Sequence, residues 1–156
     1  MLHAFQGTDG GYPVGGLIKV GGNFYGATQY GGVGGFGGAS GAGTVFSVTP
    51  AGAETVLYAF SGANDGSGPY AGLIAVGGVL YGTTYFGGGA GNQGTVFRLT
   101  LAGAETVLYS FKGHDAGDGS YPAAPLIHVG NALYGTNAYG GVNYQGAVFK
   151  VTGFKK

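Results

Sequence analysis

The sequence of 156 residues has no cysteine, no tryptophan, few charges and no long apolar run. Without cysteine, disulfides and cysteine-ligated metals are excluded. Six basic and six acidic side chains leave no basic patch for nucleic acid or for an anionic membrane surface. No apolar stretch approaches the 18 residues of a membrane-spanning helix, and the first residues do not resemble a signal peptide. We therefore expect no nucleic-acid partner and no membrane insertion.

Glycine is abundant, at 39 of 156 residues. Such a content is typical of low-complexity or disordered chains. Two features argue against disorder: Val, Ile, Leu and Phe together number 37, and the formal net charge is zero, whereas disordered chains combine low hydrophobicity with high net charge. The glycines do not recur every third residue, so a collagen helix is excluded as well. The glycine content therefore needs another explanation.

Three copies of one unit supply that explanation. Leu-Ile begins at residues 17, 73 and 126, Tyr-Gly at 25, 81 and 134, and Val-Phe at 45, 96 and 148. The longer motif Ala-Gly-Ala-Glu-Thr-Val-Leu-Tyr begins at both 51 and 102. These motifs keep their order, and successive copies are 51 to 56 residues apart. Conserved order at nearly constant spacing is the signature of an internal tandem repeat.

Each copy is predicted to form four short antiparallel strands, which in the first copy cover residues 17–20, 23–28, 44–49 and 54–60. Gly21-Gly22 suits a two-residue hairpin turn with positive φ. Alternation along the third strand places Val45 and Ser47 on one face. Because Arg98 and Lys150 replace Ser47 in the later copies, we expect this face to reach solvent. No stretch has a helical apolar period, so the fold class is all-β.

A four-stranded antiparallel unit with this period is typical of a β-propeller blade. The third copy lacks a fourth strand, and residues 2–7 match the fourth strands of the other two copies. Three blades are fewer than the four to eight of a closed propeller. We therefore predict a homodimer, a six-bladed ring in which the exchanged N-terminal strand of each chain completes the third blade of its partner. The single repeat domain 1–156 would divide into an exchanged strand and three blades at 1–7, 12–62, 69–113 and 121–152.

Several motifs point to one family: Leu-Tyr-Gly-Thr-Thr at 80–84, Gly-Thr-Val-Phe-Arg-Leu-Thr at 94–100, Glu-Thr-Val-Leu-Tyr-Ser-Phe at 105–111 and Asp-Gly-x-x-Pro-Tyr at 65–70. They resemble the glycine-, leucine- and valine-rich GloVer tandem repeat of long bacterial proteins, a propeller-like family, over nearly the whole chain. The resemblance implies that the parent protein is exported and lies outside the cell or on its surface. It brings no catalytic residue and no activity. Similarity to other propellers implies that the first strand of each copy is innermost and the fourth outermost.

The connections between the second and third strands, and between successive copies, are long, and strand alternation places them all on one face. We expect any ligand there, or in the central channel. The loop tyrosines could stack on sugar rings or seal neighbouring blades together. The loop aspartates could contact a ligand or calcium, or cap their own Asp-Gly turns. A lysine and a histidine on inner strands could form an anion site. The candidate ligand-binding residues are Tyr30, Tyr85, Tyr139, Asp9, Asp65, Asp118, Lys19 and His128.

Three functions stay open at this point. The sequence favours a non-catalytic scaffold or interaction module of an exported bacterial repeat protein, with a lectin-like carbohydrate-binding propeller as the alternative. A hydrolase or lyase is a second alternative, for which the few carboxylates, mostly on turns, give little support. Glu54 and Glu105 are expected at a strand end, a poor place for a buried acid. The histidines are dispersed and are not expected to form a site, and neither a metal nor a cofactor is predicted.

Overall fold

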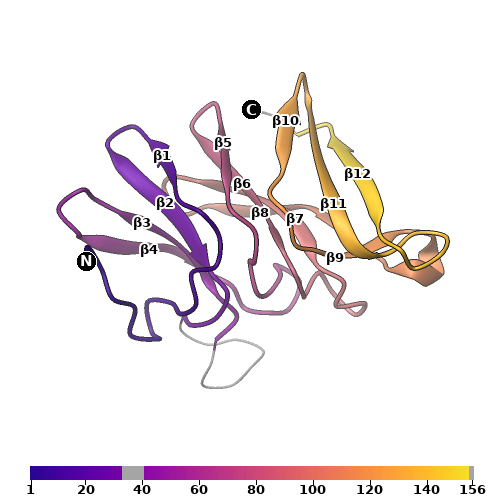
Figure 1. Cartoon of the computed structure of the whole chain (residues 1–156), viewed down its shortest axis with the longest axis horizontal. Coiled ribbons are helices and arrows are strands. Elements are labelled where there is room, and N and C mark those ends of the chain that lie inside the picture. Colours follow the sequence, from indigo (N-terminus) through magenta and orange to yellow (C-terminus); the bar gives the residue numbers. More distant parts are fainter. Residues whose placement is uncertain (33–40, 155–156) are drawn as a thin grey trace.

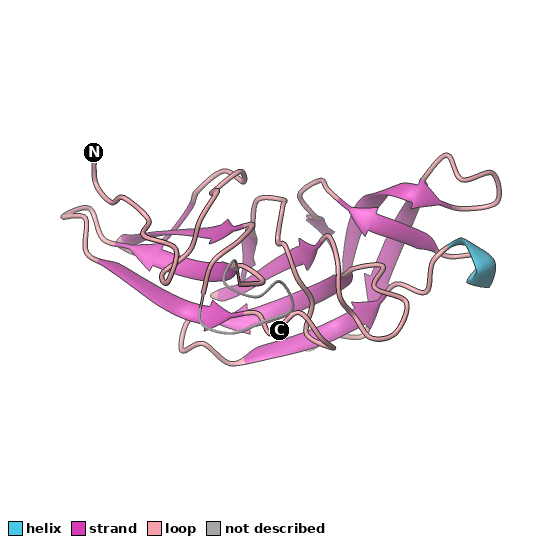
Figure 2. Cartoon of the chain, turned by 90° about the horizontal axis from the view of Figure 1, so that it is seen from below, coloured by secondary structure: helices cyan, strands magenta, loops and turns pink. Residues whose placement is uncertain are grey.

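A computed structural model describes residues 1–32 and 41–154 of the chain, so part of the glycine-rich loop 31–43 lies outside the described residues. The described chain is built of strands and loops, as the sequence predicts (Figure 2). One short 3-10 helix, His114–Ala116, was not predicted. The strands are β1 Ile18–Val20, β2 Asn23–Thr28, β3 Thr44–Val48, β4 Glu54–Ala59, β5 Ile74–Val76, β6 Val79–Thr84, β7 Thr95–Thr100, β8 Glu105–Ser110, β9 Gly119–Pro122, β10 Ile127–Val129, β11 Ala132–Gly140 and β12 Ala147–Thr152.

These strands form three four-stranded antiparallel sheets. The first sheet has the order β1-β2-β3-β4, and the second has the order β5-β6-β7-β8. In the third, β10, β11 and β12 pair in sequence, and β9 pairs with the far end of β11. The three sheets follow one another in chain order as an open row, with the hairpins β1–β2, β5–β6 and β10–β11 at one side (Figure 1). Each sheet contains the strands predicted for one copy of the repeat, and β9 is an additional strand of the third sheet that was not predicted.

The strand register is the same in all three sheets. Tyr25 of β2 lies opposite Ile18 and Ser47, and its counterparts Tyr81 and Tyr134 have the same two neighbouring positions opposite them. The turn glycine Gly21 has a φ of 57°, as the predicted hairpin requires. Tyr25 and Tyr81 are buried in the cores, whereas Tyr134 is half-buried.

A glycine follows this tyrosine in every copy because a bulky ring occupies the space above it. A Cβ atom built on Gly82 would lie 2.7 Å from the ring of Phe97 and 2.8 Å from Leu73. The same phenylalanine position contacts Gly26 and Gly135 in the other sheets. Part of the glycine content is therefore a packing requirement between neighbouring strands.

The hydrophobic cores lie between neighbouring sheets. Tyr25, Val45 and Phe60 of the first sheet pack with residues of the second, and a matching cluster with Tyr81 and Val96 joins the second sheet to the third. Val45 and Val96 are fully buried, so the prediction of a solvent-facing side of the third strand is wrong at these positions. The reason is that the following sheet packs over this face of the third strand.

The two ends of the row differ from its interior. β12 pairs only with β11 among the described strands, whereas the equivalent strands β3 and β7 pair on both sides. Residues 1–7, predicted as an outermost strand, form no strand in this structure and pair with none of the described strands. Their exchange into a partner stays a prediction.

Candidate functional site

Each connection between sheets contains an aspartate that holds the preceding outermost strand. Asp65 accepts hydrogen bonds from the hydroxyl of Tyr58, at 2.9 Å, and from the N–H of Ser61, at 2.7 Å. Asp118 accepts the equivalent bonds from Tyr109 and from the N–H of Lys112, at 2.9 and 3.0 Å. We call this arrangement the aspartate clasp. It ties β4 to the second sheet and β8 to the third.

The N-terminal segment makes the same clasp with the first sheet. Asp9 lies 2.9 Å from Nε2 of His3 and accepts the N–H of Gln6 at 2.7 Å. Phe5 packs edge-on against Phe46 with ring centroids 4.9 Å apart, as the outermost strands do in the two later interfaces. The segment therefore lies against the first sheet as the ends of β4 and β8 lie against the sheets that follow them.

The clasp lowers the pKa of Asp65 and of Asp9. Burial alone would raise the pKa of Asp65, but the hydrogen bonds from Ser61 and Tyr58 lower it below its usual value. For Asp9 burial is likewise opposed, by the Gln6 N–H and the imidazole of His3, and the pKa is again lowered. All three candidate aspartates thus have structural partners, while their contact with a ligand stays a prediction.

The structure brings Tyr30, Tyr85 and Tyr139 together on the long-loop face. They line one hollow of about 440 Å³ together with Tyr70 and Phe86. Stacking fixes the ring of Tyr85, which lies 5.1 Å from that of Tyr121 at an interplanar angle of 22°. Tyr139 also lines a neighbouring hollow of about 390 Å³, which includes Gln93, Ser120 and Tyr144.

Three tyrosines of this face, Tyr12, Tyr121 and Tyr144, have an unusual backbone with a positive φ. Tyr12 and Tyr121 have φ angles of 56° and 57°, and Gly68 holds the equivalent position in the second copy with a φ of 61°. A tyrosine in the left-handed region carries backbone strain that glycine would avoid. The first and third copies thus carry a tyrosine ring at a strained backbone position.

Lys19 and His128 are not brought together within the chain. Lys19 is exposed on β1 of the first sheet, and His128 lies on β10 of the third. The Nε2 atom of His128 is buried without a hydrogen-bond partner among the described residues, and its ring lies 6.3 Å from that of Phe154. Any shared anion site would need a second chain, and it stays a prediction.

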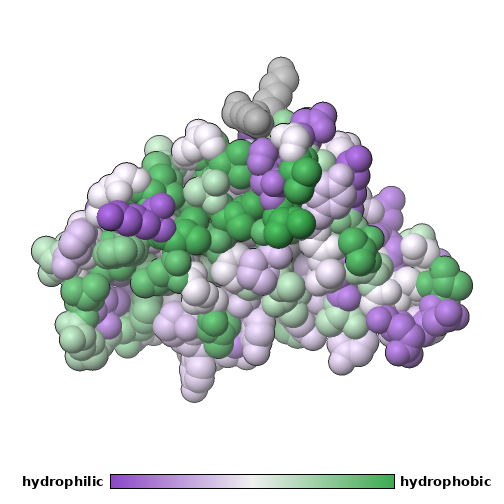
Figure 3. All heavy atoms as spheres, turned by 45° about the horizontal axis from the view of Figure 1, so that its top comes forward, coloured by the Kyte–Doolittle hydropathy of each residue, from purple (hydrophilic) through white to green (hydrophobic). Residues whose placement is uncertain are grey.

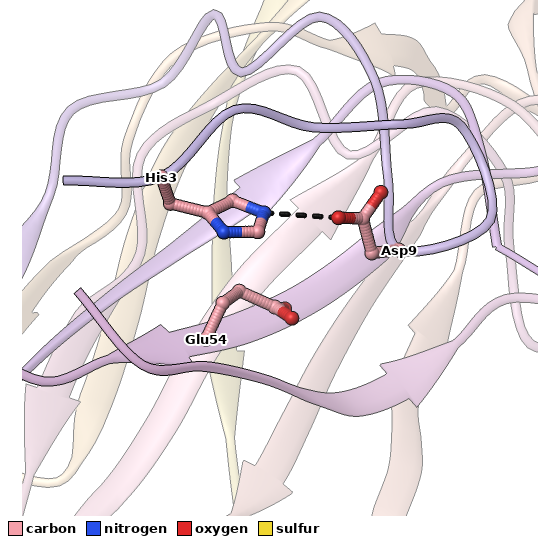
Figure 4. Close-up of side chains that lie close together, drawn as sticks. All are labelled: His3, Asp9 and Glu54. Carbon is pink, nitrogen blue, oxygen red and sulfur yellow. Dashed lines mark hydrogen bonds and ion pairs between the residues drawn. The ribbon is translucent and has the colours of Figure 1, made fainter. Parts of the chain in front are cut away.

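One cluster was missed by the sequence analysis: His3, Asp9 and Glu54 lie around a common space (Figure 4). Ligand atoms of the three side chains all lie within 4.8 Å of one another. The signal was present in the repeat, because His3 aligns with Tyr58. The clasp aspartates Asp9 and Asp65 are each followed by a glutamate at the start of the next fourth strand, Glu54 and Glu105.

Both glutamates are more buried than expected. The Oε1 atoms of Glu54 and Glu105 are buried and have no hydrogen-bond partner among the described residues. Burial raises the pKa of Glu54, and burial together with the charge of Asp65 raises the pKa of Glu105 to about 7. The expectation that this strand end is a poor place for a buried acid is therefore wrong, because the clasp covers it.

These features define an all-β repeat protein whose antiparallel sheets are joined by aspartate clasps and whose long loops carry an aromatic surface. The sequence model of the Gloeobacter/Verrucomicrobia repeat matches residues 32–156, and the chain belongs to this family. The family name GloVer abbreviates these two bacterial groups. No curated protein and no solved structure matches the chain significantly. None of the described helices is both long and apolar enough to span a bilayer.

Proposed function

We propose that the chain is a non-catalytic scaffold, a half-ring that pairs with a second copy to close a six-bladed β-propeller. One comparison carries this proposal. Apolar side chains at equivalent positions of the repeat are exposed in the two end sheets and buried in the interior of the row. Each end exposes the apolar surface that the interior sheets bury against a neighbour.

The first sheet exposes the side that should receive a preceding blade. Leu17 is 54% exposed, whereas its counterparts Leu73 and Leu126 are 3% and 2% exposed because the preceding sheet covers them. Leu17 lines a hollow of about 370 Å³ together with Phe5, Phe46 and other residues of the N-terminal segment and first sheet. This hollow has the residue types that fill the two interior cores.

The third sheet exposes the complementary side. Val148 is 79% exposed, whereas its counterparts Val45 and Val96 are both 0% exposed beneath the following sheet. Ile127 and Val129 of β10 are also more than half exposed. Figure 3 shows apolar residues gathered across the middle of the face that it presents. Burying a Val or Leu side chain contributes about 1.5–3 kcal/mol, so covering both ends offers a large driving force.

The backbone is complementary in the same way. β12 has a free edge where β3 and β7 pair with β4 and β8. The N-terminal segment 2–7 is held by its clasp with Asp9, and it lacks a strand partner among the described residues. Pairing this segment with β12 of a second copy satisfies both backbones.

Light scattering coupled to size-exclusion chromatography tests the proposal. We expect a dimer, with twice the chain mass of 15.4 kDa. Val148→Asp should give a monomer, because it places a charge in the new core. Val142→Asp is the matched control, since Val142 is exposed in the loop after β11. A wild-type monomer, or a Val148→Asp dimer of unchanged affinity, would contradict the ring.

A second candidate function is carbohydrate binding on the long-loop face. It is favoured by the hollow lined by Tyr30, Tyr85 and Tyr139, since aromatic faces with nearby hydroxyls suit the apolar face and the polar rim of a sugar. The strained tyrosines of the same face point the same way, because strain of this kind persists at sites where it serves a function.

A glycan array tests this second function. We expect binding that free sugar competes away, that falls at least about tenfold in Tyr139→Ala, and that largely persists in Tyr139→Phe, which keeps the stacking ring. An array without binding would leave the scaffold as the function. Equal binding by wild type and Tyr139→Ala would place any sugar site elsewhere.

A further inference from the structure

We propose that His3, Asp9 and Glu54 bind one divalent transition-metal ion of the Zn²⁺ class. The three side chains come from two separate parts of the chain, the N-terminal segment and the start of β4 (Figure 4). Every ligand lies within one chain and outside the aromatic surface, so the site is independent of the sugar hollow. His3 also belongs to the segment 2–7 that the proposed ring pairs with β12 of a second copy.

The geometry allows a single ion between the three groups. One ligand atom from each side chain lies within 4.8 Å of the others, and Nε2 of His3 is 2.9 Å from Oδ2 of Asp9. In a tetrahedral zinc site with bonds of about 2.0–2.2 Å, ligand atoms are about 3.3 Å apart. Small side-chain rotations therefore reach a binding arrangement. The N–H of Gln6 donates to the other carboxylate oxygen of Asp9 and orients this ligand.

The ligand set decides the class of ion. One imidazole nitrogen and two carboxylates suit zinc and related transition metals, whereas calcium and magnesium take oxygen ligands. Oε1 of Glu54 is buried without a hydrogen-bond partner among the described residues, and a bound cation would satisfy it. Three protein ligands leave one tetrahedral position for water.

The second clasp, between the first and second sheets, provides a natural comparison. Tyr58, Asp65 and Glu105 hold the equivalent positions there, and the tyrosine hydroxyl donates to Asp65 where the imidazole of His3 contacts Asp9. A neutral phenol is a poor zinc ligand, so this clasp should not bind the ion. One residue, His3, therefore distinguishes the proposed metal site from an ordinary clasp.

Binding would fasten the N-terminal segment to β4. The segment is held by its clasp and by the Phe5–Phe46 contact, and an ion shared with Glu54 adds a bond to the sheet itself. The ion thus stabilises the fold by mass action.

Isothermal titration of the full chain with ZnCl₂ tests the site. Wild type should bind one ion, and His3→Tyr should lose it while staying folded, because tyrosine holds this position in the other two copies. Glu54→Gln should bind at least about tenfold more weakly. Tyr58→His should gain a second ion, held with Asp65 and Glu105. CaCl₂ in equal amount should not displace the zinc.

Histidine-selective NMR shows which histidine binds the ion. Zinc should shift the imidazole signals of His3 and leave those of His128 unchanged. The proposal is overturned if His3→Tyr binds zinc with unchanged stoichiometry and affinity, if the His3 signals do not move, or if calcium displaces the ion.

Discussion

At the scale of single residues, the clasp explains an unusual pair of acids. Glu54 and Glu105 begin outermost strands, where solvent would normally keep a carboxylate ionised, yet each lies beneath the segment that the clasp holds in place. Asp65 accepts several hydrogen bonds that lower its pKa, while burial raises the pKa of the neighbouring Glu105 and favours its neutral form. Two carboxyls a short distance apart therefore have opposite pKa shifts.

Glu105 makes stability depend on pH. Its pKa rises from 4.5 to about 7 on folding, so its stabilising contribution is complete below about pH 4.5 and is lost as the pH rises through about 7. Glu105→Gln should leave the free energy of unfolding nearly unchanged at about pH 4.5 and raise it on the order of 1 kcal/mol at about pH 8, a value reduced for solvent screening. Urea denaturation at both pH values measures this. An equal effect at both would contradict the buried acid.

At the scale of strands, a polar pair joins the second and third strands of two sheets. The hydroxyls of Thr28 and Thr44 lie 2.8 Å apart, and the pair Thr84–Thr95 repeats the bond. In the third sheet Asn137 and Ala147 take these positions, and both amide atoms of Asn137 are buried without partners among the described residues. The third sheet thus lacks a bond that the other two have.

Restoring the pair should stabilise the third sheet. The double substitution Asn137→Thr with Ala147→Thr removes a buried unsatisfied amide and adds a threonine–threonine bond, which together should raise the free energy of unfolding by about 1–2 kcal/mol. Chemical denaturation measures the change. Thr84→Val should move stability in the opposite direction by about 1 kcal/mol or more. If the double variant is less stable than wild type, the repeat equivalence at this position is wrong.

The strands could be predicted from the sequence, but the burial of their side chains and the contacts between distant segments could not. β2 has the predicted bounds 23–28, and β3 ends one residue before its predicted end, because glycine turns and β-branched runs act locally. The burial of Val45 depends on the neighbouring sheet, which alternation within one strand does not reveal. The meeting of His3 with Glu54 likewise depends on how the N-terminal segment folds across the first sheet.

At the scale of the whole molecule, the sheets depend on one another. Both described hydrophobic clusters draw residues from two neighbouring sheets. A sheet at the end of the described row is therefore covered by a neighbouring sheet on one side only. Stability in such arrays is a sum of unit and neighbour terms.

Dimer formation should therefore appear in thermal unfolding. Because only the proposed dimer would bury the end surfaces, the unfolding midpoint should rise by about 2 °C for each tenfold increase in protein concentration. Scanning calorimetry over a concentration series measures this. Val148→Asp should unfold at a lower temperature that does not depend on concentration. A wild-type midpoint without concentration dependence would argue that the row is stable as a single chain.

The clasp also separates the genetic unit from the folding unit. Each aspartate ties a strand of one sheet to the start of the next, so a repeat counted from strand to strand never coincides with a self-sufficient piece of structure. Duplication or loss of a whole repeat would recreate the same two complementary ends. Under the proposed closure, copy number in the gene would then set how many chains share a ring, while every contact between neighbours stayed as it is.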